Sequence, residues 1–206
     1  LIAQRASASR GITCSLQPKP NMTPETIAIN DLKRQTESLA AELRAAVERV
    51  LARGWFVLGP EVEAFEREFA AYCGVGQCVA LANGTEALEL ALRAAGVGPG
   101  DRVATVANAG GYATTAIRAL GGLPVYVEID PERLTMSPAA LEAALTPDLR
   151  AIVVTHLYGR MADMPALLRA AARPSIPIIE DCAQAHGAAL DGRRAGAWGA
   201  VGCYSF

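Results

Sequence analysis

Short apolar runs alternate with segments of helical periodicity along most of this chain, from about Gln77 to the last residue. Each run is bounded by turn residues, and in the segments between them apolar positions recur every three or four residues. The strands predicted from the runs are Cys78–Leu81, Arg102–Ala107, Pro124–Ile129, Ala151–Thr155, Ile176–Glu180 and Ala200–Phe206. Strands that are apolar on both faces and separated by helices indicate an α/β fold with a mostly parallel, doubly wound sheet.

The predicted helices between these strands begin and end at turn or capping residues. They cover the stretch from Asn83-Gly84-Thr85 to Ala95, then Tyr112–Leu120, Ser137–Leu145 and Asp163–Ala172. Two further helices are predicted before the alternating region, one capped by Asp31 and running to about Arg53, and one beginning at Pro60 and ending at Gly74. The second carries apolar side chains at helical spacing, which predicts core residues: Val62, Phe65, Phe69 and Tyr72.

The composition narrows the class of protein. The chain has 206 residues, is 51% hydrophobic and has a formal net charge of -2. This length is enough for one sizeable core, and the slight acidity gives no electrostatic basis for binding nucleic acid. No apolar run approaches the roughly 20 residues that span a bilayer. Five cysteines without a CxxC pair argue against metal sites and disulfides, so we expect a reducing cytoplasm.

The first residues differ from the rest. Residues 1 to 21 are rich in Ser and Arg and contain no Asp or Glu. An organelle transit peptide has this composition, and an upstream extension before a natural start at Met22 is the alternative. Because the stretch has no clear apolar helical face, we favour the extension. We expect residues 1–25 to be disordered and residues 26–206 to form one domain.

Polar side chains follow the strand that ends at Glu180. Asp181 comes next, and Gln184 and His186 lie a few residues beyond. In open α/β sheets, ligands bind just past the carboxyl ends of the strands. An Asp placed there can hold a proton on a ring nitrogen of a cofactor, although a strand-end Asp can equally cap a turn.

Other polar or aromatic positions lie just after a predicted strand or near the end of one. Gly84 and Thr85 offer free amides at a helix start, where an anion such as phosphate binds. Tyr112 could stack on a flat ring, and Ser205 could donate to an anion. For each of these an ordinary structural role is the alternative. The absence of GxGxxG and of a Walker A motif argues against NAD and nucleotide triphosphates.

A histidine and a cysteine, residue types that often act in catalysis, are predicted to have structural roles here. His156 is expected to be satisfied by backbone groups rather than to act as a catalyst. Cys182 has no evident activating base and is interpreted as a small apolar filler. The remaining set is a phosphate site, a stacking aromatic and a strand-end Asp in chain order. That set suits pyridoxal 5'-phosphate (PLP), whose ring nitrogen a carboxylate keeps protonated.

From about Thr26 to Phe206, the sequence resembles the DegT/DnrJ/StrS-type sugar aminotransferases, a branch of the fold-type I PLP enzymes. The order and spacing of several short motifs carry the resemblance: Gly59-Pro60-Glu61-Val62 with Phe65-Glu66, Asn83-Gly84-Thr85-Glu86-Ala87-Leu88, Gly98-Pro99-Gly100-Asp101, His156-Leu157-Tyr158-Gly159, Glu180-Asp181-Cys182-Ala183-Gln184-Ala185-His186-Gly187 and Gly202-Cys203-Tyr204-Ser205-Phe206. The resemblance implies the large domain of such an enzyme, with the small C-terminal domain missing.

The resemblance also implies roles for particular residues. Gly84, Thr85 and Ser205 would bind the cofactor phosphate and Tyr112 would stack on the ring. Asp181 would pair with the ring nitrogen, and Gln184 would lie beside the ring hydroxyl. It implies amino transfer, usually from glutamate, to a keto sugar attached to a nucleotide, by a homodimer with active sites at the subunit interface.

One feature departs from the family's pattern. The Schiff-base lysine of the family lies shortly after the last motif, beyond Phe206, and the lysines present, Lys19 and Lys33, are far upstream. PLP chemistry needs that amine, so the chain as given is expected to be an inactive fragment. A PLP-dependent sugar dehydratase, in which a histidine can replace the lysine, and a non-catalytic relic remain alternatives. The residue at the lysine position would separate the dehydratase from the aminotransferase.

Overall fold

The computed structural model describes residues 30–172 and 175–206, so the extension predicted for residues 1–25 lies outside the described part. The chain divides after Gly54 into two compact units. Within the described ranges, every helix is too short or too polar to cross a membrane.

The described part of the first unit, residues 30–54, contains two helices where the sequence predicts one. They are α1 (Leu32–Ser38) and α2 (Ala40–Arg53). Asp31 caps α1 as expected, since its carboxylate accepts a hydrogen bond from the backbone N–H of Arg34 at 3.1 Å. The break falls at Leu39 because the Thr36 and Ser38 hydroxyls donate to backbone carbonyl groups in the preceding turn, a competition that bends helices.

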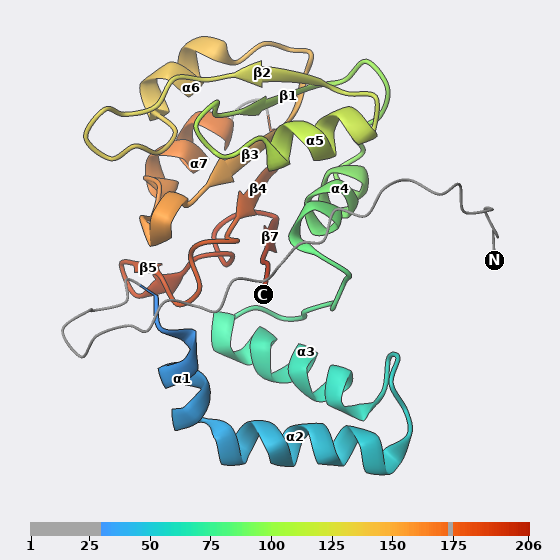
Figure 1. The fold of residues 1–206 in the computed structure, drawn as a ribbon. Helices are drawn as coiled ribbons and strands as arrows, with labels where there is room; N and C mark the ends of the chain where they lie inside the picture. Colours follow the sequence, from blue (N-terminus) through green and yellow to red (C-terminus); the bar gives the residue numbers. More distant parts are fainter. Residues whose placement is uncertain (1–29, 173–174) are drawn as a thin grey trace, which may run out of the picture. The chain divides into compact units, whose positions relative to one another are not determined.

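The second unit is built on a five-stranded sheet with the order β2-β1-β3-β4-β7 (Figure 1). Every pairing of neighbours in this sheet is parallel, which confirms the predicted fold class. The strands are β1 (Arg102–Thr105), β2 (Leu123–Tyr126), β3 (Leu149–Thr155), β4 (Ile178–Asp181) and β7 (Val201–Cys203). A small antiparallel hairpin of β5 (Ala189–Leu190) and β6 (Arg193–Arg194) lies between β4 and β7 in the chain and was not predicted.

Helices cover both faces of the sheet, as predicted. The helices of this unit are α3 (Pro60–Cys73), α4 (Gly84–Ala94), α5 (Tyr112–Ala119), α6 (Pro138–Ala144) and α7 (Met164–Ala172). On one face α4 and α5 bury Leu88, Leu92 and Ile117 against Val103, Val153 and Ile179. On the other face α6 and α7 bury Leu141, Met164 and Leu167 against Ile152, Val154 and Ile178. Because side chains alternate along a strand, the odd positions of β3 and β4 face α4 and α5, and the even positions face α6 and α7.

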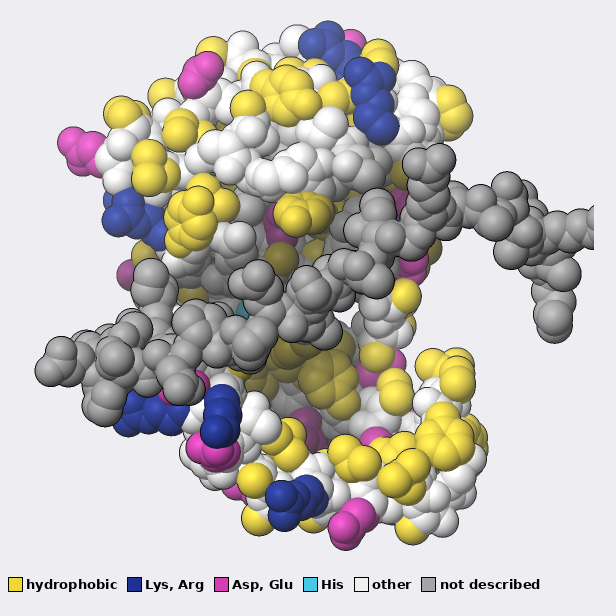
Figure 2. Space-filling view, in the orientation of Figure 1, with side chains coloured by type: hydrophobic (Ala, Val, Ile, Leu, Met, Phe, Trp, Pro, Cys, Tyr) yellow, Lys and Arg dark blue, Asp and Glu magenta, His cyan; other side chains and the backbone are white. Residues whose placement is uncertain are grey.

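The strand predicted at Cys78–Leu81 is not formed. This segment lies across an apolar groove of about 620 Å³ from β7, with Phe65 and Phe69 of α3 also in the wall. Hydrophobic side chains line the hollow beside α3 (Figure 2). A strand needs a partner for its ladder of backbone hydrogen bonds. Among the described residues, β4 is the only strand paired with β7, and none is paired with Cys78–Leu81.

The aromatic residues of α3 were predicted to be core, and for two of them the prediction is wrong. Phe65 is 39% exposed and Tyr72 is 45% exposed. They belong to a surface cluster in which Phe69 packs edge-on against Tyr204 and Phe206, with ring centroids 4.9 and 5.2 Å apart. The predicted helix is formed, but the face that carries these aromatic residues packs against Tyr204 and Phe206 rather than inside the buried core.

Candidate functional site at the carboxyl edge of the sheet

The end of β4 sends two neighbouring carboxylates to opposite faces of the sheet. Thr155 of β3 pairs with Asp181, and Val154 pairs with Glu180. Asp181 therefore lies on the side of α4 and α5, and Glu180 on the side of α6 and α7. Asp181 also pairs with Cys203 of β7, so the residues that follow β7 leave the sheet beside it.

Asp181 is buried with neutral partners. It is 5% exposed, and its oxygens accept hydrogen bonds from the Ala183 N–H at 3.2 Å and, weakly, from the Thr155 hydroxyl at 3.4 Å. Burial raises the pKa of Asp181 above its ordinary value, although these two hydrogen bonds act in the opposite direction. A carboxylate in this state gains most from a cationic group placed against it, such as a protonated ring nitrogen.

The start of α4 carries the backbone amides that were predicted to bind an anion. Asn83 caps the helix, because its side-chain oxygen accepts from the Glu86 N–H at 3.0 Å. The N–H groups of Gly84 and Thr85, in the first turn, have no acceptor within the helix. A Cβ added to Gly84 would lie 2.8 Å from the Cβ of Ser205. Only glycine allows this approach. Gly84 and Ser205 therefore lie together beside the end of β7, and we call this pair the Gly84–Ser205 cradle.

Gln184 is exposed, and a hydrogen bond fixes the orientation of its side-chain amide. Its side-chain oxygen accepts a hydrogen bond from the backbone N–H of Tyr158 at 2.9 Å. The amide NH2 group is therefore the end of Gln184 that remains to donate elsewhere. Tyr158 belongs to the short 3-10 turn η1 (Leu157–Gly159) that follows β3, so this contact joins the loops after β3 and β4.

Tyr112 is the first residue of α5 and its side chain is 60% exposed. It follows β1, which is separated from β4 by β3 alone. Its helix shares a face of the sheet with α4, the face on which Asp181 lies. The structure thus places Tyr112 at the same edge as Asp181 and Gly84, with an accessible ring, while its stacking role stays a prediction.

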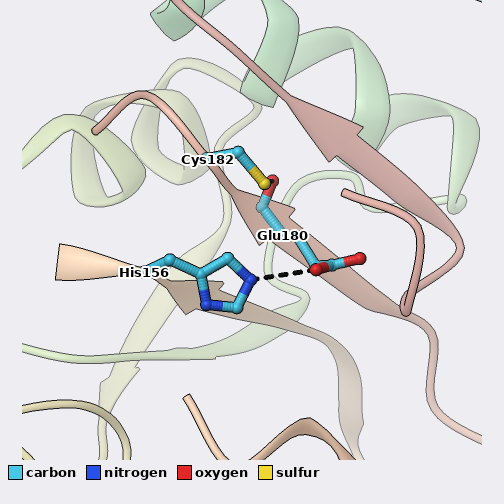
Figure 3. Close-up of side chains that lie close together, drawn as sticks. All are labelled: His156, Glu180 and Cys182. Carbon is cyan, nitrogen blue, oxygen red and sulfur yellow. Dashed lines mark hydrogen bonds and ion pairs between the residues drawn. The ribbon is translucent and has the colours of Figure 1, made fainter. Parts of the chain in front are cut away.

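The opposite face holds a polar network that the sequence did not reveal (Figure 3). His156 and Glu180 are both fully buried, with 2.9 Å between His156 Nε2 and Glu180 Oε2. The other ring nitrogen, Nδ1, accepts from the Ala162 N–H at 3.2 Å, so the proton of the neutral ring sits on Nε2 and is donated to Glu180. The expectation that backbone groups satisfy His156 is correct for Nδ1 and misses Glu180.

The Glu180 carboxylate is held ionised by its hydrogen bonds. Burial pushes its pKa upward, but the bonds from His156 and from the N–H groups of Gly199 and Gly196 outweigh burial, so the pKa lies below its ordinary value. Asp181 and Glu180, adjacent in the chain, therefore have pKa values shifted in opposite directions.

Cys182 completes a group of three possible metal ligands with His156 and Glu180, whose ligand atoms lie within 4.8 Å of one another (Figure 3). The hydrogen bonds argue against a metal ion there. Both Glu180 oxygens accept hydrogen bonds, His156 Nδ1 accepts from the Ala162 N–H, and His156 Nε2 carries the proton that it donates to Glu180. Burial raises the pKa of the Cys182 thiol far above its usual value. The thiol packs with Ala185 and Ala195, which confirms its interpretation as a filler.

The residues at this edge fit PLP. Gly84 leaves an open approach to helix amides beside a serine hydroxyl, and Asp181 is a buried carboxylate without a cationic partner among the described residues. Both lie at the carboxyl edge, on the face covered by α4 and α5. The donor set therefore matches a ligand with an anionic tail and a basic ring nitrogen.

The chain is similar in sequence to known sugar aminotransferases. The chain is 47% identical over 176 residues to the dTDP-3-amino-3,4,6-trideoxy-alpha-D-glucose transaminase of Streptomyces venezuelae, covering 85% of this chain and 46% of the relative. It is 43% identical to the UDP-2-acetamido-2-deoxy-3-oxo-D-glucuronate aminotransferase of Pseudomonas aeruginosa, covering 85% of this chain and 49% of that protein. The chain thus spans about half the length of the curated relatives it matches.

Solved structures give the same result. S. venezuelae DesV, solved in complex with a ketimine intermediate, superposes with a TM-score of 0.83 at 47% identity, covering 85% of this chain and 47% of that one. An aminotransferase from Brucella abortus gives a TM-score of 0.84 at 35% identity, covering 88% and 50%. The model of the DegT/DnrJ/EryC1/StrS aminotransferase family matches residues 37–206. Because the family model covers most of the chain and a curated relative is 47% identical over 85% of it, this chain belongs to the DegT/DnrJ/EryC1/StrS aminotransferase family.

Proposed function

We propose that this protein binds PLP and serves the transfer of an amino group to a keto sugar attached to a nucleotide. The family and the names of the relatives support the reaction. The observation that carries the cofactor proposal is Asp181, a buried carboxylate with neutral partners on the same face and edge as the Gly84–Ser205 cradle.

Each residue at the edge has a defined task in this proposal. PLP supplies an electron sink at the substrate carbon. Asp181 holds the proton on the ring nitrogen, which keeps the ring electron-poor. The amides of Gly84 and Thr85 and the hydroxyl of Ser205 hold the phosphate. Gln184 donates its free amide N–H to the ring hydroxyl, and Tyr112 stacks on the ring.

The proposal also covers the amino donor, the oligomeric state, the choice of reaction and the compartment. Glutamate is the amino donor and the protein acts as a homodimer, as the resemblance implies. Because relatives are named as transaminases, we favour amino transfer over the dehydratase alternative. The described cysteines Cys73, Cys78, Cys182 and Cys203 are free, which suits a reducing compartment such as the cytoplasm.

The test is a titration of the purified 206-residue chain with PLP, followed by tryptophan fluorescence and by equilibrium dialysis. We expect saturable binding that inorganic phosphate weakens by competition. Pyridoxal, which lacks the phosphate, should bind about tenfold or more weakly, because it loses charge-assisted hydrogen bonds at the α4 start. Equal affinity for PLP and pyridoxal would show that Gly84 and Ser205 do not bind the phosphate. An absence of saturable binding would refute the cofactor assignment.

A further inference from the structure

The buried carboxylate of Glu180 is the point at which three segments of the second unit meet. It accepts four hydrogen bonds: from His156 Nε2 at 2.9 Å, Gly196 N at 2.9 Å, Trp198 N at 2.7 Å and Gly199 N at 2.6 Å. Two reach each oxygen, so the carboxylate is saturated with donors. Its own strand, β4, ends one residue later at Asp181.

The first branch of this network fixes the entry into β7. Residues 196–199 wrap around the carboxylate, and Ala200 N then donates to Ile178 O at 2.8 Å, which starts the pairing of β7 with β4. Gly199 has no room for a side chain, because a Cβ there would collide with the Ile178 carbonyl oxygen. The position of Ser205, two residues past the end of β7, therefore depends on this turn.

The second branch fixes the loop after β3. His156 N donates to Asp181 O at 3.0 Å, and His156 Nδ1 accepts from Ala162 N at 3.2 Å, so one residue holds both ends of the loop from 156 to 162. Within this loop Tyr158 has φ +55, a left-handed conformation that is strained for a residue other than glycine. Its N–H points at the Gln184 side-chain oxygen.

We propose that Glu180 is a positioning residue for the cofactor site, which it serves from the opposite face of the sheet. Through the turn before β7 it places Ser205, and through His156 and Tyr158 it orients the amide of Gln184. Glu180 does not touch the cofactor. The inference rests on the proposed function, since it concerns the residues assigned there to the phosphate and the ring hydroxyl.

A carboxylate is required for this task, rather than any polar group. Glutamine would present an NH2 group to one pair of donors, and two N–H groups would then face each other in a buried site. The variant Glu180→Gln preserves volume, so it tests the donor arrangement rather than packing.

The experiment compares PLP dissociation constants of the 206-residue wild type and Glu180→Gln at low temperature, where circular dichroism shows both to be folded. We expect the variant to bind PLP about tenfold more weakly, because Ser205 and Gln184 lose their fixed positions. Leu141→Ala, which destabilises the core between α6 and the sheet but removes none of the hydrogen bonds to Glu180, is the control and should keep the wild-type dissociation constant. Equal weakening in both variants would show a general effect of instability and overturn the inference.

A measurement on the wild type alone keeps the inference testable if Glu180→Gln does not fold. Coupling is reciprocal, so PLP binding should slow amide hydrogen exchange at Ala162, Gly196, Trp198 and Gly199, across the sheet from the cofactor. Unchanged exchange at these amides, with PLP bound, would overturn the inference and leave the proposed function intact. Absence of PLP binding to the wild type would instead refute the proposed function and, with it, this inference.

Discussion

Glu180 and Asp181 are neighbours in the chain, end the same strand and are both buried, yet their surroundings differ in kind. Glu180 has a complete set of donors, and its pKa lies below the ordinary value. Asp181 has two neutral donors, one of them at 3.4 Å, and its pKa lies above the ordinary value. A carboxylate with every lone pair used stabilises the fold, whereas a buried carboxylate without a cationic partner is available to a ligand.

The largest expected effect is on stability, at Glu180. Glu180→Ala would leave the His156 ring N–H and three backbone N–H groups buried without an acceptor. Removing one partner of a buried charged network destabilises by about 3–5 kcal/mol. For a chain of this length that is a decrease in Tm on the order of 10 °C. Thermal unfolding monitored by circular dichroism measures this change. A loss of less than about 1 kcal/mol in the free energy of unfolding would show that water replaces these hydrogen bonds.

The matching substitution at Asp181 should act on the ligand instead. Asp181→Asn keeps the shape but removes the charge that pairs with a ring nitrogen, so PLP affinity should fall by about 10- to 100-fold. Stability near pH 7 should be unchanged or higher, because a buried charge is removed. Dialysis against PLP gives the affinity. Asp148→Asn, an exposed carboxylate at the amino-terminal end of β3, is the control and should bind PLP as the wild type does.

A smaller effect is expected at the phosphate end of the site. Gly84→Ala adds a Cβ 2.8 Å from the Cβ of Ser205, and such overpacking costs about 1–3 kcal/mol even though alanine favours helices. Both stability and PLP affinity should decrease. At Gly98 an added Cβ has its nearest neighbour at 3.9 Å, so Gly98→Ala should change neither. A Gly84→Ala protein with wild-type PLP affinity would contradict the phosphate cradle.

Tyr112 should contribute less than either end of the site. Because Tyr112 is 60% exposed, Tyr112→Ala should leave Tm unchanged. Loss of one stacking contact of about 0.5–1.5 kcal/mol predicts a few-fold weaker PLP binding. Tyr112→Phe keeps the ring and should bind as the wild type does, so equal losses in both variants would assign the effect to the hydroxyl and rule out stacking.

The smallest predicted effect is a change of slope with pH. The folded state holds the Asp181 proton to higher pH than the unfolded state does, since the folded pKa is raised. Stability of the wild type relative to Asp181→Asn should therefore fall as pH rises through about 4 and level off above the folded pKa. Urea unfolding of both proteins between about pH 3 and 7 measures this difference, and a difference that rises with pH would contradict a raised pKa.

Much of the second unit could be predicted from the sequence because alternating apolar runs and capped helices are local signals. Asn83 and Ser137 cap α4 and α6 as expected, and the strands of the five-stranded sheet pair in parallel as predicted. Cys78–Leu81 shows the limit of this reasoning. Its residues suit a strand, but a strand exists only where another strand offers hydrogen bonds.

The site divides in the same way. Asp181 could be predicted because it ends a strand at the edge of the sheet where ligands bind. Gly84 could be predicted because it follows the capping residue Asn83 at a helix start, although the strand expected before it is not formed. The donors to Glu180 could not be found, since they are backbone N–H groups at 196, 198 and 199 together with a histidine 24 residues upstream of Glu180. Backbone donors have no signature in the sequence, and only the small residues around Trp198 hint at a tight turn.

The central claim is that Asp181 faces the ring nitrogen of PLP and keeps it protonated. The most direct measurement is the nitrogen chemical shift of PLP labelled with ¹⁵N in the ring, bound to the wild type and to Asp181→Asn at neutral pH. We predict a protonated ring nitrogen in the wild type and an unprotonated one in the variant. An unprotonated nitrogen in the wild type, or the same shift in both proteins, would contradict the account.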